Sequence, residues 1–254
     1  MYCDSHAHLT SPEVLPEVDA ILERAKAARV DWIVNICTDQ KSLEEGLKLG
    51  EKYRWVVNTG ATTPHDVDRD GERDFPAFEA AASRLVAIGE TGLDYHYQHS
   101  ERTTQRKFLI RYLQLAAKIK KPVIFHCREA FDDLFSIADA EYPKGAPAIL
   151  HCFTGTIKEA EGVWKRGWAL SLSGIVTFKK SEELRLVAKE APLEQLLIET
   201  DTPYLAPQSR RGKPNEPSYI IETAACIAAA RNVPVAEVAA ATRINALRLF
   251  QLSN

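Results

Sequence analysis

Eight short apolar runs, each followed by a longer segment, constrain the fold of this chain more than any other feature. Several of these runs are rich in β-branched residues and lack polar alternation, which is typical of parallel strands buried on both faces. The predicted strands are Tyr2–Leu9, Trp32–Cys37, Val56–Ala61, Val86–Glu90, Pro122–Cys127, Ala148–Cys152, Trp168–Ser173 and Leu196–Asp201.

The segments between these runs predict helices. Arg102–Ile119 places apolar residues at the 3.6-residue spacing of one helix face, and Glu13–Ala28 does the same. Ser181–Ala191 begins with a serine and two glutamates, which suits a helix N-terminus. After the eighth run, Glu216–Arg231 and Val235–Leu252 predict two additional helices.

Eight strands alternating with helices predict an α/β fold, a (β/α)8 TIM barrel with additional C-terminal helices. A doubly wound sheet is the alternative, but it usually has fewer strands and often a glycine-rich phosphate loop. Neither of the two patterns of such a loop, G-x-G-x-x-G and G-x-x-x-x-G-K-[ST], occurs in this sequence. The 254 residues suit one barrel, and no composition shift or repeat marks a linker. We therefore expect residues 1–254 to form a single barrel domain.

Composition excludes several classes of protein. The chain has 32 Lys and Arg against 35 Asp and Glu, a net charge of −3, which argues against a protein that coats nucleic acid. The five cysteines are scattered without a C-x-x-C pair and are expected to be reduced. No stretch resembles a signal peptide or a membrane-spanning helix, so we expect a cytosolic protein with no membrane partner.

Polar, ligand-type side chains end five of the predicted strands. Barrel enzymes place their active sites at the C-terminal ends of the strands. His6 and His8 end the first strand and point to the same side, because alternate residues of a strand share a face. The other four groups are Glu90 on the fourth strand, His126 on the fifth, His151 on the sixth and Asp201 on the eighth.

This combination predicts a metal site rather than isolated structural histidines. Four imidazoles and two carboxylates are too many ligands for one tetrahedral ion. They suit two divalent ions that share a bridging carboxylate, an arrangement that can clamp the attacking and leaving oxygens of a displacement. Four imidazoles favour Zn, whereas carboxylate ligands suit Mg or Mn.

Several segments resemble the TatD-like family of metal-dependent deoxyribonucleases, within the amidohydrolase-type barrels. The similarity runs nearly end to end. The most specific pieces are HCFTG and ETD-x-PYL, which occur in this order and precede the loop that contains NEP (215–217). The matching segments are DSHAHL (4–9), AIGETGLDY (87–95), PVIFHCREA (122–130), LHCFTGT (150–156), LLIETDTPYL (196–205), RRGKPNEP (210–217) and NALRLF (245–250).

The resemblance assigns roles to these residues. It implies that His6, His8 and Asp201 hold one metal ion, that His126 and His151 hold the second, and that Glu90 bridges them. It also implies a 3'-5' exonuclease acting on single-stranded DNA. One position departs from the family pattern, because Thr63 stands where relatives often carry the first histidine of a G-x-H-P-H stretch.

The expected reaction is hydrolysis of a phosphodiester by a water that two metal ions activate, with Asp201 as general base and Glu90 as the bridging group. Arg128 shares the strand face of His126 and can reach a phosphate oxygen, although an ion pair with Glu129 or Asp132 is the alternative. The aromatic candidates for stacking on a base are Tyr95, Tyr97, Phe153 and Tyr204. The further substrate-binding candidates are His65, Arg210, Arg211, Asn215 and Glu216.

Two other functions are open to such a barrel. Related architectures cleave amides, lactones and other esters, but many of those enzymes carry a lysine at the end of the fourth strand, where this chain has Glu90. A non-enzymatic binding barrel is the third reading, and the full ligand set argues against it. DNA is therefore the expected partner, and no obligatory protein partner is inferred.

Overall fold

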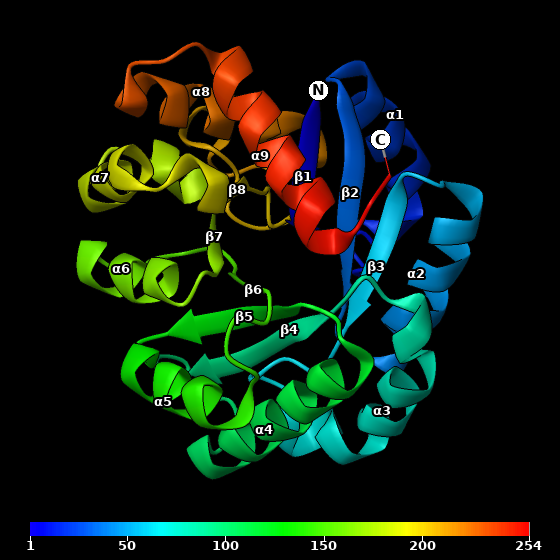
Figure 1. Ribbon diagram of the computed structural model, residues 1–254. Helices are drawn as coiled ribbons and strands as arrows, with labels where there is room; N and C mark the ends of the chain where they lie inside the picture. The colour runs from blue at the N-terminus through cyan, green and yellow to red at the C-terminus, as the bar shows by residue number, and fades with distance from the viewer. Residues whose placement is uncertain (254) are drawn as a thin grey trace.

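The computed structural model of the protein describes residues 1–253, and within them eight parallel strands form one sheet in the order β1 to β8 (Figure 1). Each strand therefore pairs with its neighbours in the sequence. The strands are β1 (Tyr2–Ala7), β2 (Val30–Cys37), β3 (Val56–Gly60), β4 (Ala87–Asp94), β5 (Val123–Arg128), β6 (Ala148–Leu150), β7 (Ala169–Leu172) and β8 (Leu196–Ile198).

The sheet curls round so that β1 meets the segment that follows β8. Ala7 forms an isolated parallel bridge with Thr202. On either side of it, the Asp201 N–H donates to the His6 carbonyl at 2.9 Å and the His8 N–H donates to the Thr202 carbonyl at 2.8 Å. The seam of the barrel is thus built from the backbone of three predicted metal ligands, which fixes their relative positions.

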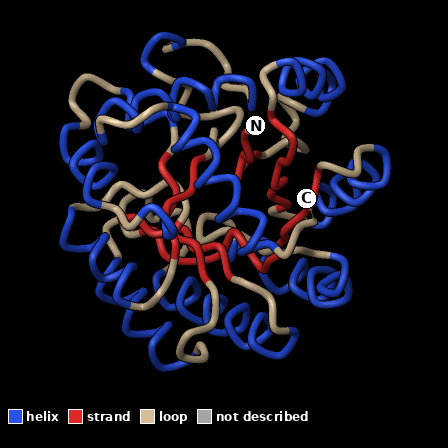
Figure 2. Tube along the Cα trace, turned by 45° about the horizontal axis from the view of Figure 1, so that its top comes forward, coloured by secondary structure: helices blue, strands red, loops and turns tan. Residues whose placement is uncertain are grey.

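Helices surround the strands as an outer ring (Figure 2). In the described part of the chain they are α1 (Val18–Ala27), α2 (Gln40–Lys52), α3 (Val67–Ala81), α4 (Arg102–Ile119), α5 (Phe131–Glu141), α6 (Ile157–Lys165), α7 (Glu182–Glu190), α8 (Ile220–Arg231) and α9 (Val235–Phe250). The first seven connect successive strands, whereas α8 and α9 follow β8.

The predicted (β/α)8 barrel with additional C-terminal helices is confirmed, and the doubly wound alternative is wrong. The main differences lie at element ends. β4 continues four residues past Glu90 because Thr91 and Asp94 pair with β5. α1 begins at Val18 rather than at residue 13, because Leu15–Glu17 form a short 3-10 helix that contains Pro16.

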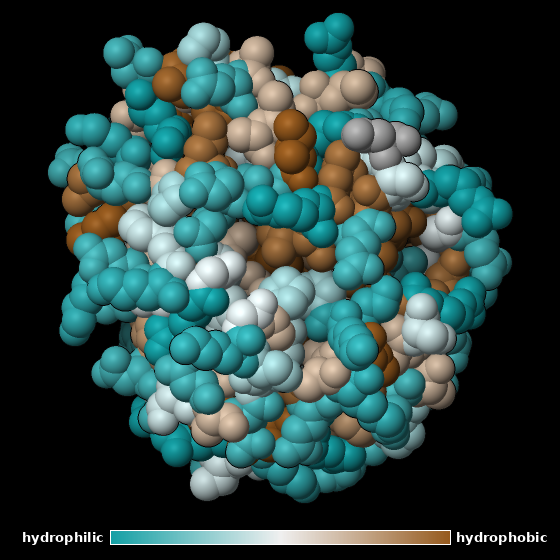
Figure 3. All heavy atoms as spheres, in the orientation of Figure 1, coloured by the Kyte–Doolittle hydropathy of each residue, from teal (hydrophilic) through white to brown (hydrophobic). Residues whose placement is uncertain are grey.

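The inside of the barrel is layered along the strands. Its lower part is apolar and includes Ile124, Ile149 and Leu197, with Phe250 of α9 packed against the same cluster. His126, His151 and Glu199 each follow one of these three apolar residues by two positions. Because alternate residues of an extended chain share a face, they also point into the barrel, one layer higher. An apolar floor therefore lies beneath a polar layer. The surface of the face over which α9 runs is mostly hydrophilic, with apolar side chains near its centre (Figure 3).

In residues 1–253, no single helix combines the length and apolar character needed to cross a membrane. The helical segments 217–231 and 235–250 are bent by 113° relative to each other. They meet the length and hydropathy criterion only when the two are counted together.

We expect Gly92→Ala to destabilise the protein by more than about 3 kcal/mol. Gly92 has a φ of +153°, and a Cβ there would lie 1.9 Å from the His126 carbonyl oxygen, which belongs to the backbone of the adjacent strand. Urea unfolding in the presence of a chelator measures the loss without a contribution from bound metal.

Gly145→Ala is the matched control. Gly145 also has a positive φ, +79°, but nothing lies within 4 Å of its added Cβ. Its cost is the backbone strain alone, about 1–2 kcal/mol. Equal losses in the two variants would contradict the close approach of β4 to β5.

Candidate metal centre

The carboxylate of Glu90 lies at the centre of the polar layer. Glu90 is on β4 and is 5% exposed. Its Oε1 atom lies 2.9 Å from Nδ1 of His126, on β5, and 3.0 Å from Nε2 of His151, just past β6. These three groups, brought together from three neighbouring strands, are called site two below.

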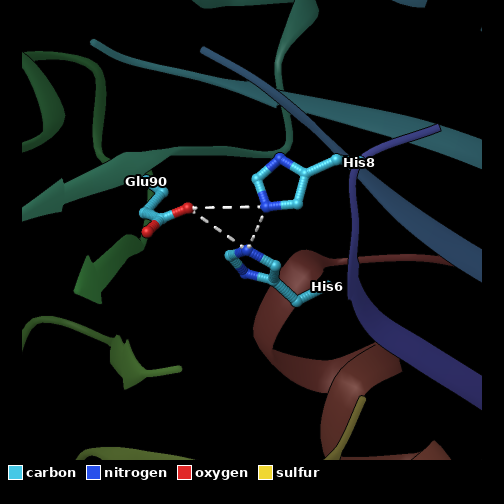
Figure 4. A group of neighbouring side chains, drawn as sticks. All are labelled: His6, His8 and Glu90. Carbon is cyan, nitrogen blue, oxygen red and sulfur yellow. Dashed lines mark hydrogen bonds and ion pairs between the residues drawn. The ribbon is translucent and has the colours of Figure 1, made fainter. Parts of the chain in front are cut away.

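The other oxygen of Glu90 faces the first strand. Figure 4 shows the rings of His6 and His8 converging on it, and the Glu90 Oε2 atom lies 3.3 Å from His6 Nε2 and 3.8 Å from His8 Nε2. Asp201 completes this group, with Oδ1 3.6 Å from His6 Nε2 and 3.4 Å from His8 Nε2. These four residues are called site one.

The donor set in each site suits a divalent cation. In site one the two Nε2 atoms of His6 and His8 lie 3.3 Å apart, and in site two His126 Nδ1 and His151 Nε2 have the same separation. Nitrogen lone pairs and carboxylate oxygens that crowd around one point repel each other unless a proton or a cation lies among them. Imidazole and carboxylate together suit Zn, Mn or Mg. The residues present therefore fit two metal ions bridged by Glu90.

The charges and hydrogen bonds of the polar layer favour the ionised form of the Glu90 side chain. Burial would raise the pKa of Glu90, but the charge of His151 and the hydrogen bonds of the surrounding imidazoles hold its pKa well below its usual value. Burial would lower the pKa of His151, but the charge of Glu90 and the contact with Glu199 raise it well above the usual value. In the absence of metal, a proton on His151 thus neutralises part of the carboxylate charge.

The remaining imidazoles divide into two classes. The pKa values of His8 and His126 are raised, because contacts with Asp201 and with Asp94, respectively, outweigh the effect of burial. The pKa of His6 is lowered, because its full burial and the neighbouring His151 outweigh its contact with Glu90. His6 is therefore the ring most ready to offer an unprotonated nitrogen.

Two buried carboxylates next to the ligands were missed by the sequence reasoning. Asp94 Oδ2 lies 2.8 Å from His126 Nε2, and Glu199 Oε1 lies 3.5 Å from His151 Nδ1. Alternation was the signal that could have found them. Asp94 comes four residues after Glu90 on β4, and Glu199 comes two residues before Asp201 within the predicted eighth strand, so alternation would have turned each to the side of a predicted ligand.

A cavity of about 560 Å³ opens above both sites. Five of the six predicted ligands line it, while His6, which is 0% exposed, lies beneath. His65 and Arg128 line the cavity as expected, and Arg128 places its guanidinium over the Tyr97 ring at 4.6 Å. Thr63 is also in the wall, and its hydroxyl donates to Asp66.

The rim aromatics require a correction. Tyr97 and Tyr204 line the cavity and are 51% and 53% exposed. Tyr95 and Phe153 are buried in the core, so they present no ring to a base. Tyr95 instead donates its hydroxyl to Asp133, under α4 and α5.

The loop after β8 does not bring its predicted substrate-binding residues into the cavity. Arg210 pairs with Glu222, and Arg211 packs its guanidinium over the Phe178 ring. Asn215 is buried and donates to the carbonyls of residues 200 and 204, and Glu216 forms an ion pair with Arg24. These contacts let Asn215 and Glu216 hold the segment that carries Asp201, and their predicted substrate-binding role stays a prediction.

The family model described as TatD related DNase matches residues 3–251. The chain belongs to this family. The TatD-family chain is 36% identical over 255 residues to the uncharacterized metal-dependent hydrolase YabD of Bacillus subtilis, with 100% of both chains covered. It is 34% identical over 259 residues to the 3'-5' ssDNA/RNA exonuclease TatD of Erwinia tasmaniensis, covering 98% of this chain and 99% of the relative.

A solved structure agrees with these relatives. The crystal structure of YjjV, a TatD homologue from Escherichia coli, superimposes with a TM-score of 0.93 at 26% identity, covering 99% of this chain and 98% of the other. The family and the relatives together show that this TatD-family protein is a metal-dependent hydrolase. Which residues hold the metal stays a prediction, which the two convergent sites support.

Mn²⁺ binding is expected to strengthen as the pH rises from 6 to 8. Imidazole binds metal only when the nitrogen is unprotonated, and the raised pKa values of His8, His126 and His151 keep protons on these rings at the lower pH. Each displaced proton contributes about tenfold in affinity per pH unit over the range where the ring is protonated. Calorimetric titrations at several pH values measure the effect, and an affinity independent of pH would exclude these imidazoles as ligands.

Proposed function

We propose that the protein hydrolyses phosphodiester bonds of single-stranded DNA from the 3' end, using two divalent metal ions, with Mg or Mn preferred and Zn tolerated. The observation that carries the proposal is the division of one buried carboxylate between two ligand groups: each oxygen of Glu90 faces its own imidazoles. Such a bridged pair of sites suits an in-line displacement at phosphorus. The name of the Erwinia relative supports the polarity and the substrate.

The charge of the cavity supports metal-dependent binding of a phosphate. Among the described residues that line it, the carboxylates Asp39, Asp66, Glu90 and Asp201 outnumber Arg128, the one Lys or Arg. Without cations, and with the lining imidazoles neutral, such a cavity repels a phosphodiester. Two divalent ions reverse the local charge, and when bound they also polarise the phosphoryl oxygens and lower the pKa of a coordinated water.

The chain's own residues have separate roles in this proposal. Asp201 keeps Oδ1 in site one, and its other oxygen accepts the proton of the attacking water. Arg128 has no carboxylate within 4.0 Å in the described structure, so its guanidinium is available for a nonbridging phosphate oxygen. Tyr204, held through its backbone carbonyl by Asn215, presents an exposed ring next to His8 that can stack on the terminal base.

A cleft of this size takes the end of a strand rather than a duplex. Tyr204 lies on the site-one side of the cavity, and Tyr97 with Arg128 lies on the site-two side. A strand that enters between them brings its terminal phosphodiester over Glu90.

A single domain over residues 1–254 and a cytosolic location stay predictions.

The direct test is digestion of a single-stranded DNA oligonucleotide that carries its label at the 5' end. We expect labelled products that shorten progressively with Mg²⁺ or Mn²⁺, and no products after chelation, because the cavity then repels the phosphate. Immediate release of a labelled mononucleotide would contradict the polarity. Turnover of ring amides or lactones with no cleavage of DNA or RNA would contradict the proposed substrate class.

His126→Ala and Asp201→Asn are each expected to lower kcat/KM on this oligonucleotide at least about 100-fold, because one removes a ligand and the other the proton acceptor. The melting temperature of the metal-free variants tests that the fold survives. His96→Ala is the matched control, since His96 pairs with Glu129 outside the cavity and its loss leaves activity unchanged. Parental activity in either site variant would exclude its assigned role.

A further inference from the structure

A cluster of buried polar atoms lies beneath the two proposed metal sites, and neither site uses it. Nδ1 of His6, Nδ1 of His151 and Oε1 of Glu199 are all buried, and none has a hydrogen-bond partner among the described residues. A ring nitrogen of each histidine and a carboxylate oxygen of Glu199 lie within 4.8 Å of one another. Buried polar groups without partners are costly, so their occurrence together calls for a joint explanation.

The two histidine rings are arranged as a parallel pair. His6 and His151 stack with their centroids 3.8 Å apart and their planes at 7°. Both rings direct Nε2 at Glu90, at 3.3 Å and 3.0 Å. The Nδ1 edge of each ring is therefore turned away from Glu90, and for His151 that edge lies 3.5 Å from Glu199 Oε1.

Glu199 is held so that only one of its oxygens is free. It is 0% exposed, and its Oε2 accepts the hydroxyl of Ser171 on β7. The Ser171 oxygen in turn accepts the backbone N–H of Cys152, the residue after His151. These bonds fix the carboxylate within the barrel and leave Oε1 as a free acceptor 3.5 Å from Nδ1 of His151, while a ring nitrogen of His6 lies within 4.8 Å of a Glu199 carboxylate oxygen.

We propose that Glu199 is a positioning residue shared by both metal sites: its Oε1 accepts the Nδ1–H groups of His6 and His151, so that each ring presents an unprotonated Nε2 to its own site. This inference rests on the two metal sites of the proposed function. The negative charge of Glu199 opposes the lowering of the His6 pKa and adds to the raising of the His151 pKa, which agrees with a carboxylate near each ring. One carboxylate thereby links a ligand of site one to a ligand of site two.

Asp94 provides an internal contrast. Its Oδ2 lies 2.8 Å from Nε2 of His126, and its Oδ1 accepts the backbone N–H groups of residues 96 and 97. His126 belongs to site two alone. A change at Asp94 is therefore expected to weaken the binding of one metal ion, whereas a change at Glu199 weakens the binding of both.

Mn²⁺ titration by calorimetry compares the parent with Glu199→Gln and Asp94→Asn. Glutamine keeps the size of the side chain and one acceptor oxygen but removes the charge, and neutral hydrogen bonds are weaker than charge-assisted ones. Loss of such a supporting contact typically costs about 10–100-fold in metal affinity. We expect that loss for both ions in Glu199→Gln and for one ion in Asp94→Asn.

A spectroscopic measurement separates positioning from a general loss of stability. In the Zn²⁺-loaded protein labelled with ¹⁵N-histidine, the Nδ1–H protons of His6 and His151 are expected far downfield, as for protons shared with a carboxylate. Both resonances should move upfield in Glu199→Gln, and neither should move in Asp94→Asn. Glu199→Met, which removes the acceptor, should have the larger effect, and Glu199→Gln carries the test if the methionine variant does not fold.

The outcomes distinguish this inference from the proposed function. A parent protein that binds fewer than two Mn²⁺ ions contradicts the two-metal proposal, whatever Glu199 does. The shared role of Glu199 is overturned if the parent binds two ions but Glu199→Gln weakens the binding of only one or neither and leaves both Nδ1–H resonances in place. Weakening of both ions with both resonances moved supports it.

Discussion

A buried carboxylate cannot remain charged without compensation, and the organisation of this protein follows from how it compensates Glu90. Removing a carboxylate from water costs several kcal/mol unless opposite charge or hydrogen-bond donors surround it. Here four imidazoles from three strands surround the Glu90 carboxylate, two at each oxygen. Protons supply the compensation in the free protein, and divalent cations do so when they bind. The same constraint therefore favours the binding of divalent cations at Glu90, and we expect the affinity to depend on pH.

The fold gives these groups their positions by two simple means. Parallel strands bring all of their C-terminal ends to one rim, and strand alternation turns every second side chain inward. The closing hydrogen bonds between β1 and the segment after β8 involve the backbone of His6, His8 and Asp201. Closing the barrel and assembling site one are therefore the same structural event. Below the polar layer, an apolar floor that includes Ile124, Ile149 and Leu197 keeps water from the strands.

The sequence predicted the strands well, and the six candidate ligands that it named do converge at one rim, because both depend on local patterns. Buried parallel strands are continuous apolar runs, and ligands follow at their ends. The supporting residues were harder to predict. Asp94 looks like a loop carboxylate until the length of β4 is known, and the inward orientation of Glu199 is not evident from the sequence. The contacts of the loop after β8 were equally hard to predict, because Asn215 carries no local sign that its amide holds the backbone carbonyls of residues 200 and 204.

The central claim is that two cations share the Glu90 carboxylate. Anomalous diffraction from crystals loaded with Mn²⁺ tests it most directly, because the signal identifies both the element and the number of ions. We expect two peaks at the rim, one bounded by His6, His8 and Asp201 and the other by His126 and His151, each in contact with a different oxygen of Glu90. A single peak, or two peaks that do not both contact Glu90, would contradict it.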